Sequence, residues 1–113
     1  MDIDRDELSA RLDDLAILDV RSPVEFSGEA GYPCDPRQGH IPGARNIEYS
    51  ELLARSPEEI RELVGLPAGA EIVAYCHSGS RSAVAVQALR LAGYEARNYP
   101  GSWHEWSRVV GEE

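Results

Sequence analysis

The sequence predicts an α/β fold, a single domain over residues 1–113 with a mainly parallel central sheet and helices on both faces. Short apolar runs alternate with segments that begin at helix-capping residues. The length of 113 residues is enough for one hydrophobic core and too short for two. With 42% hydrophobic and 27% charged residues, the composition is that of an ordinary globular domain.

Each helix start and strand has a local signal. A capping residue followed three positions later by glutamate predicts a helix at four places: Asp4 with Glu7, Ser22 with Glu25, Ser56 with Glu59, and Ser102 with Glu105. A further helix begins near Arg81 and ends at Gly93. The apolar or β-forming runs predict strands at residues 16–20, 44–49, 71–76 and 95–100. Residues 27–39, with three glycines and two prolines, predict a long surface loop.

One cysteine stands at the junction of a strand and a helix. Cys76 ends the strand 71–76, and a loop of small polar residues leads from it to Arg81 at the next helix. Ligands of open α/β sheets bind at such carboxyl ends of strands, where helix N-termini point. The free N–H groups, the helix dipole and the arginine favour a thiolate over a thiol. We therefore expect Cys76 to be a nucleophile within an anion-binding loop.

Four motifs occur in order along the chain: LDVRSPVEF (18–26), GHIPGARNI (39–47), CHSGSRS (76–82) and GYEARNYPGSWHEW (93–106). Together they resemble the rhodanese (sulfurtransferase) superfamily over almost the whole chain. The nearest likeness is to the C-terminal catalytic half of bacterial tandem thiosulfate sulfurtransferases, although only one domain is present here. Whether the chain stands alone or is half of such an enzyme stays open.

The resemblance implies a sulfurtransferase in which Cys76 takes a sulfane sulfur from thiosulfate or a related small anionic donor. The resulting persulfide would pass its outer sulfur to cyanide, a thiol or a protein acceptor. No metal or organic cofactor is needed for this chemistry. The expected substrate-binding residues are those of the loop: His77, Ser78, Gly79, Ser80 and Arg81.

Two other functions are compatible with the same cysteine. A cysteine-dependent phosphatase or arsenate reductase would place five residues between nucleophile and arginine, whereas four separate Cys76 from Arg81. A non-catalytic persulfide-carrying or regulatory module is the second alternative. Vertebrate mitochondrial members of the resembled family have basic residues where this chain has Ser78 and Glu25, so thiosulfate is expected to be a poor substrate. The loop also lacks the pattern of mercaptopyruvate users, and a persulfide or a protein donor stays open.

Several conspicuous residues are expected to have structural roles. In the resembled family the positions of Asp19, Arg21 and Glu25 brace the sheet end, and that of His40 is structural. Trp103 and Trp106, at helical spacing, are expected to anchor the core or the wall of a cleft. Cys34 in the long loop is by default an exposed thiol without a role. The alternative is that it resolves the persulfide or forms a disulfide with Cys76.

The overall charge limits the partners. A net charge of −9 argues against nucleic acid and anionic membrane surfaces. No apolar run approaches the ~20 residues of a membrane span, and the N-terminus lacks a signal-peptide profile. Two cysteines are too few for a disulfide framework, and neither lies in a cluster with metal-ligand spacing. We expect a cytoplasmic monomer.

Overall fold

The computed structural model describes residues 2–109 and contains a four-stranded parallel sheet in the order β2-β1-β3-β4. The strands are β1 (Ala16–Asp19), β2 (Arg45–Asn46), β3 (Glu71–Tyr75) and β4 (Glu95–Asn98). In the register of the sheet, Leu18 of β1 lies opposite both Arg45 and Ala74. The predicted parallel sheet is therefore confirmed.

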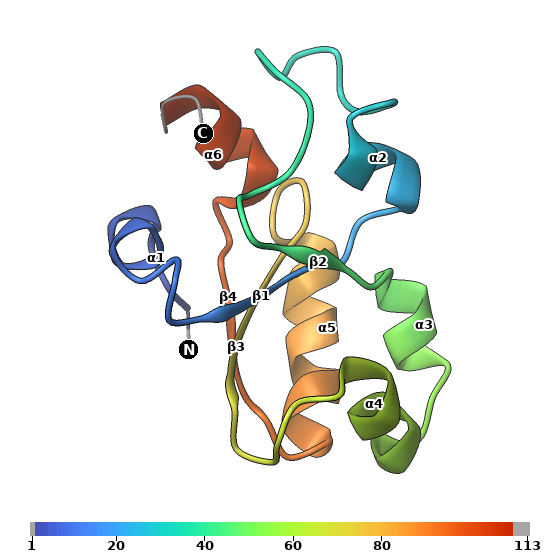
Figure 1. Cartoon of the computed structure of the whole chain (residues 1–113). Helices are drawn as coiled ribbons and strands as arrows, with labels where there is room; N and C mark the ends of the chain where they lie inside the picture. Colours follow the sequence, from blue (N-terminus) through green and yellow to red (C-terminus); the bar gives the residue numbers. More distant parts are fainter. Residues whose placement is uncertain (1, 110–113) are drawn as a thin grey trace.

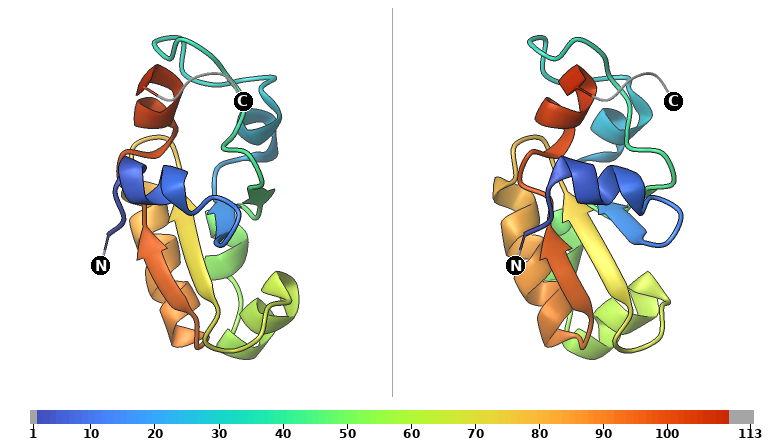
Figure 2. Two further views of the ribbon diagram at one scale, coloured as in Figure 1. Left: turned by 60° about the vertical axis from the view of Figure 1, so that its left-hand side comes forward. Right: turned by 90° about the vertical axis from the view of Figure 1, so that its left-hand side faces the viewer.

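Helices cover both faces of this sheet, as predicted (Figures 1 and 2). The helices are α1 (Arg5–Ala10), α2 (Pro23–Ser27), α3 (Tyr49–Leu53), α4 (Pro57–Val64), α5 (Ser80–Leu91) and α6 (Ser102–Val109). Alternate strand residues point to opposite faces. Leu18 and Ile72 accordingly belong to the core cluster under α3, α4 and α5, whereas Ile17 and Val73 belong to the cluster under α1 and α6. None of the helices in residues 2–109 has the length and apolar character needed to cross a bilayer.

Local capping accounts for three of the helix starts, and at the start of α2 the Ser22 amide donates a hydrogen bond of 3.1 Å to Glu25 Oε1. Asp4 Oδ1 accepts a hydrogen bond of 2.8 Å from the Glu7 amide at the start of α1, and Ser56 Oγ accepts one of 3.2 Å from Glu59 at the start of α4. Such a bond satisfies one of the free N–H groups at a helix N-terminus.

The predicted strand over 44–49 is wrong at its carboxyl end. Strand β2 comprises only Arg45 and Asn46, and Tyr49 already begins α3. Beyond Asn46 the Ile47 and Tyr49 amides still donate hydrogen bonds of 3.0 Å to the Asp19 and Val20 carbonyls, but the chain forms no further strand. It turns instead into a helix that the sequence pattern did not reveal.

The predicted capping box of Ser102 with Glu105 is also wrong. Ser102 lies at a φ of 54°, and its hydroxyl accepts a hydrogen bond of 3.1 Å from the Cys76 amide and donates one of 2.8 Å to the Tyr99 carbonyl. The Glu105 carboxylate accepts a hydrogen bond from the Tyr99 hydroxyl. Contacts with Tyr99 and with the distant Cys76 have thus replaced the cap between Ser102 and Glu105.

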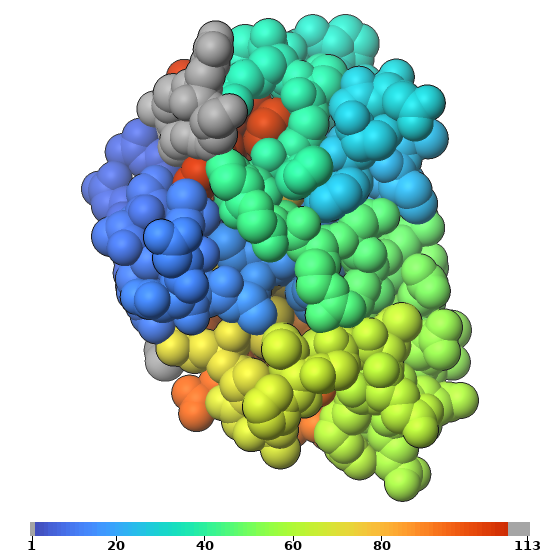
Figure 3. Space-filling view, in the orientation of Figure 1, coloured from blue at the N-terminus to red at the C-terminus, as the bar shows by residue number. Residues whose placement is uncertain are grey.

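The carboxyl ends of the strands form the functional end of the molecule. From β1 the chain passes to β2 on one side of the sheet and later returns to β3 on the other, which creates a topological switch point between β1 and β3. The loop after β3, helix α2, helix α6 and the long loop of residues 28–44 all gather at this end (Figure 1). In the space-filling view the long loop spreads over this end, and part of α6 is visible between its atoms (Figure 3).

Candidate active site

The sulfur of Cys76 lies at the carboxyl end of β3 and at the N-terminus of α5. It accepts hydrogen bonds from the Gly79 amide at 3.1 Å and the Ser82 amide at 3.4 Å, and the Ser82 hydroxyl lies 3.4 Å away. Two N–H groups that a helix start leaves without partners therefore point at one sulfur atom. This arrangement stabilises negative charge on the sulfur.

The loop around Cys76 depends on a glycine. Gly79 has a φ of 95°, a left-handed conformation that L side chains rarely adopt. A Cβ atom at this position would lie 2.8 Å from the Pro100 carbonyl oxygen and 2.9 Å from its Cα. Together with the hydrogen bond from the Cys76 amide to Ser102, this close approach fixes the loop against the segment between β4 and α6.

Burial and hydrogen bonding act in opposite directions on the Cys76 thiol. Burial raises its pKa, whereas the hydrogen bonds from the Ser82 hydroxyl and amide and from the Gly79 amide lower it. The balance leaves the pKa of Cys76 below its ordinary value. A buried cysteine would otherwise be an inert hydrophobic side chain.

Arg81 lies in the first turn of α5 and forms a paired contact with Glu25 of α2. Its two terminal nitrogens are 3.0 and 3.2 Å from the two carboxylate oxygens. Burial raises the pKa of Glu25, but the hydrogen bonds from Arg81 and Ser22 outweigh this and lower it to about 2. Both side chains line a pocket of about 350 Å³ that is completed by residues 30–33. The charge of Arg81 therefore lies at the wall of this pocket, where the Glu25 carboxylate largely compensates it.

The remaining predicted loop residues differ in exposure. Ser78 and Ser80 are exposed. His77 is buried, its ring stacks on Tyr32 at a centroid distance of 3.6 Å, and its Nε2 lies 3.1 Å from a carboxylate oxygen of Asp35. Cys76 is itself only 1% exposed, so neighbouring residues must move aside before a sulfur donor can reach its sulfur atom.

The residues that were expected to be structural have structural contacts. Arg21 and Asp19 form a buried ion pair of 2.7 Å, and Arg21 also donates to the Gly39 carbonyl. His40 stacks on Phe26, with its Nδ1 2.8 Å from the Phe26 carbonyl oxygen. The two tryptophans of α6 are buried in the core.

Three residues that contact the loop were not assigned to the site from the sequence. Ser82 belongs to the CHSGSRS motif, and its position one turn into the helix was the available signal. Ser102 carries a stronger signal for a helix cap than for a contact with Cys76. Asp35 belongs to the long loop but is buried, and nothing in its local sequence indicates this. Both cysteines are free, and Cys34 is exposed.

Comparisons with known proteins identify the family of this chain. The family model for the Rhodanese-like domain matches residues 4–109. A Haloferax volcanii protein named "Putative thiosulfate sulfurtransferase" is 42% identical over 95% of this chain and 43% of its own length. A Thermus thermophilus protein named "Sulfur carrier protein TtuD" is 40% identical over 85% of this chain and 39% of its own length.

Two solved structures are also similar to this chain. One described as "Crystal Structure of Probable Thiosulfate Sulfurtransferase" has a TM-score of 0.85 and 50% identity over 95% of this chain and 44% of that one. The Tum1 protein from Saccharomyces cerevisiae has a TM-score of 0.78 and 26% identity over 97% of this chain and 44% of its own. This chain spans less than half the length of these relatives. It belongs to the family of rhodanese-like domains.

Proposed function

We propose that this domain is a sulfurtransferase that carries a sulfane sulfur as a persulfide on Cys76. The observation that carries the proposal is the convergence of the Gly79 and Ser82 amides on the Cys76 sulfur at a helix N-terminus. These donors stabilise the attacking thiolate, and they can stabilise a terminal persulfide sulfur in the same way. The names of the relatives, which refer to sulfur transfer and sulfur carriage, support the same chemistry.

The reaction has two displacement steps. The Cys76 thiolate attacks the outer sulfur of thiosulfate, a new S–S bond forms, and sulfite leaves with the electron pair of the broken bond. A nucleophile such as cyanide then attacks the outer sulfur of the persulfide. Thiocyanate leaves, and the electron pair of the S–S bond returns to Cys76 as thiolate. No net oxidation or reduction of the protein occurs over the cycle.

The pairing of Arg81 with Glu25 favours a donor other than thiosulfate. A small dianion would gain little from an arginine whose charge is already compensated at 3.0 Å. A persulfide or a protein-bound sulfur places less negative charge in the cleft. This observation supports a second candidate function, a sulfur-carrying module that accepts and releases sulfur without rapid turnover of thiosulfate.

Mass spectrometry of the intact protein tests the proposal. Incubation of the reduced chain with thiosulfate should add about 32 Da at Cys76, and cyanide should remove this mass as thiocyanate. Cys76→Ser should abolish the mass shift, and the matched variant Cys34→Ser should keep it. A shift that survives in Cys76→Ser or maps to Cys34 would overturn the proposal.

Steady-state assays separate the remaining functions. A sulfurtransferase forms thiocyanate over many cycles, whereas a carrier releases about one equivalent for each loaded chain. Hydrolysis of an aryl phosphate that depends on Cys76 would instead support a phosphatase. The four-residue spacing between Cys76 and Arg81, shorter than the five of such phosphatases, argues against that result.

A further inference from the structure

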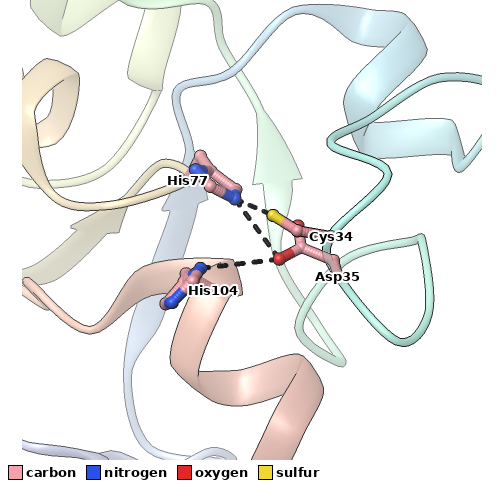
Figure 4. A group of neighbouring side chains, drawn as sticks. All are labelled: Cys34, Asp35, His77 and His104. Atoms are coloured by element: carbon pink, nitrogen blue, oxygen red, sulfur yellow. Dashed lines mark hydrogen bonds and ion pairs between the residues drawn. The ribbon is translucent and has the colours of Figure 1, made fainter.

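Four side chains with metal-binding chemistry converge beside the catalytic loop. Cys34 and Asp35 come from the long loop, His77 follows Cys76, and His104 lies on α6; in Figure 4 the four point toward one another. One donor atom from each lies within 4.8 Å of every other. His77 Nε2 is 3.1 Å from Asp35 Oδ2, and His104 Nδ1 is 3.6 Å from Asp35 Oδ1. Three segments far apart in the sequence thus supply one cluster.

The carboxylate at the centre of this cluster has an oxygen without a hydrogen bond. The Asp35 side chain is only 1% exposed, and its Oδ2 is buried and accepts no hydrogen bond within the described chain. The other oxygen, Oδ1, accepts a hydrogen bond of 2.8 Å from Arg108. Leaving a buried carboxylate oxygen without a partner is costly. The Oδ2 atom lies 3.1 Å from His77 Nε2, which itself is 3.3 Å from Oδ1, so a cation that replaced this contact would bind Oδ2 and the imidazole nitrogen together.

We propose that Cys34, Asp35, His77 and His104 bind one zinc ion. Thiolate, imidazole and carboxylate are the ligands that Zn²⁺ takes, usually four in a tetrahedron. Metal–ligand bonds of 2.0–2.3 Å place the ligand atoms roughly 3.3–3.8 Å apart, so the widest pair must close by about 1 Å. Cys34 is exposed and the His104 side chain is 49% exposed, which leaves both free to make this adjustment and leaves the ion a way in.

Neighbouring residues hold the ligands in place. Tyr32 stacks on the His77 ring at an interplanar angle of 13°. Arg108 holds Asp35 through Oδ1 and also donates to the Cys34 carbonyl at 2.7 Å, so it orients two ligands through atoms that the ion does not need. Contacts of this kind are typical of the shell around metal ligands. The thiolate and the carboxylate supply two negative charges, Arg108 compensates part of the second, and the net charge of −9 favours cations over the whole chain.

Neither cysteine has metal-ligand spacing in the sequence, because the ligands come from three separate segments. The site does not use Cys76 and does not depend on the proposed sulfur transfer. An ion at this position would join the long loop to α6 and to the residue next to the nucleophile. It would therefore restrain the backbone next to Cys76.

Titration of the reduced, chelator-treated chain with Zn²⁺ alone tests the site. Calorimetry should show one equivalent bound to the wild type, and Zn²⁺ should raise its melting temperature. Co²⁺ should give the visible spectrum of a four-coordinate ion with a thiolate ligand. Cys34→Ser and His104→Ala should each weaken Zn²⁺ binding by at least about 100-fold, because loss of a ligand costs more than loss of an outer contact.

Two matched variants identify the ligands. Cys76→Ser and His40→Ala should bind Zn²⁺ as the wild type does, since they change the other cysteine and a histidine outside the cluster. Both Cys34 and His104 are exposed, so their variants should melt like the wild type when no metal is present. The proposal is overturned if the wild type binds no Zn²⁺ at micromolar concentration. It is equally overturned if Cys34→Ser binds normally, or if Cys76→Ser is the variant that loses binding.

Discussion

Replacement of Gly79 by alanine tests whether the catalytic loop is held by close packing. The alanine would have to adopt a φ of 95°. Its Cβ would lie 2.8 Å from the Pro100 carbonyl oxygen, about 0.6 Å closer than an ordinary contact. The left-handed conformation costs about 1–2 kcal/mol, and forcing the backbones apart adds about 1–3 kcal/mol. We expect Gly79→Ala to lower the free energy of unfolding by about 2–5 kcal/mol.

Gly93→Ala is the matched control. Gly93 has a φ of 100°, and a Cβ there would meet nothing within 4 Å, so this variant should lose only the conformational part, about 1–2 kcal/mol. Urea denaturation at equilibrium measures both values. Gly79→Ala should also slow persulfide formation, because the amide at residue 79 donates to the Cys76 sulfur. Equal losses of stability in the two variants would refute the argument that Pro100 confines the loop.

Three further predictions concern single side chains. Ser82→Ala removes the hydroxyl near the Cys76 sulfur and with it about 1 kcal/mol of thiolate stabilisation. In the presence of chelator, it should slow iodoacetamide alkylation of this cysteine at pH 7 about fivefold. Arg21→Met leaves Asp19 buried without its counter-charge and should lower the free energy of unfolding by about 3–5 kcal/mol. Glu25, with its pKa lowered to about 2, stabilises the fold fully above pH 4.5. The stability difference between wild type and Glu25→Gln should therefore shrink as the pH falls from 4.5 toward 2 in urea titrations.

Each of these predictions has a result that contradicts it. Ser80→Ala, in an exposed position of the same loop, should leave alkylation unchanged, and an equal effect of both serine variants would exclude a specific role for the Ser82 hydroxyl. Arg55→Met breaks an exposed pair with Glu51 and should cost less than about 1 kcal/mol. If Arg21→Met lowered the free energy of unfolding by less than about 1 kcal/mol as well, its ion pair with Asp19 would not be desolvated. For Glu25→Gln, a stability difference that stays constant down to pH 2.5 would rule out the ion pair with Arg81.

The place of Cys76 at a helix N-terminus could be predicted from the sequence because its signals are local. An apolar strand, a loop of glycine and serine and a helix start follow one another within residues 71–82, and this order alone places Cys76 at a helix N-terminus. The same holds for α1 and α4, whose caps lie three residues from their partners.

The rest of the site depends on contacts across long stretches of chain. Ser102 meets Cys76 across 26 positions and Asp35 meets His77 across 42, and neither pairing leaves a trace in the neighbouring residues. For Ser102 a local signal pointed elsewhere, because a serine three positions before a glutamate usually caps a helix. Helix α3 was missed for the opposite reason: its first residue follows Glu48, which makes no side-chain capping bond.

The attachment of the Cys76 loop to Pro100 and Ser102 has a consequence for biosynthesis. When Cys76 emerges from the ribosome, the residues that confine Gly79 and bind the Cys76 amide have not yet emerged behind it. The thiol therefore acquires its final surroundings only when β4 and the start of α6 have emerged and docked. A nascent or C-terminally shortened chain would therefore lack a fully formed sulfur pocket.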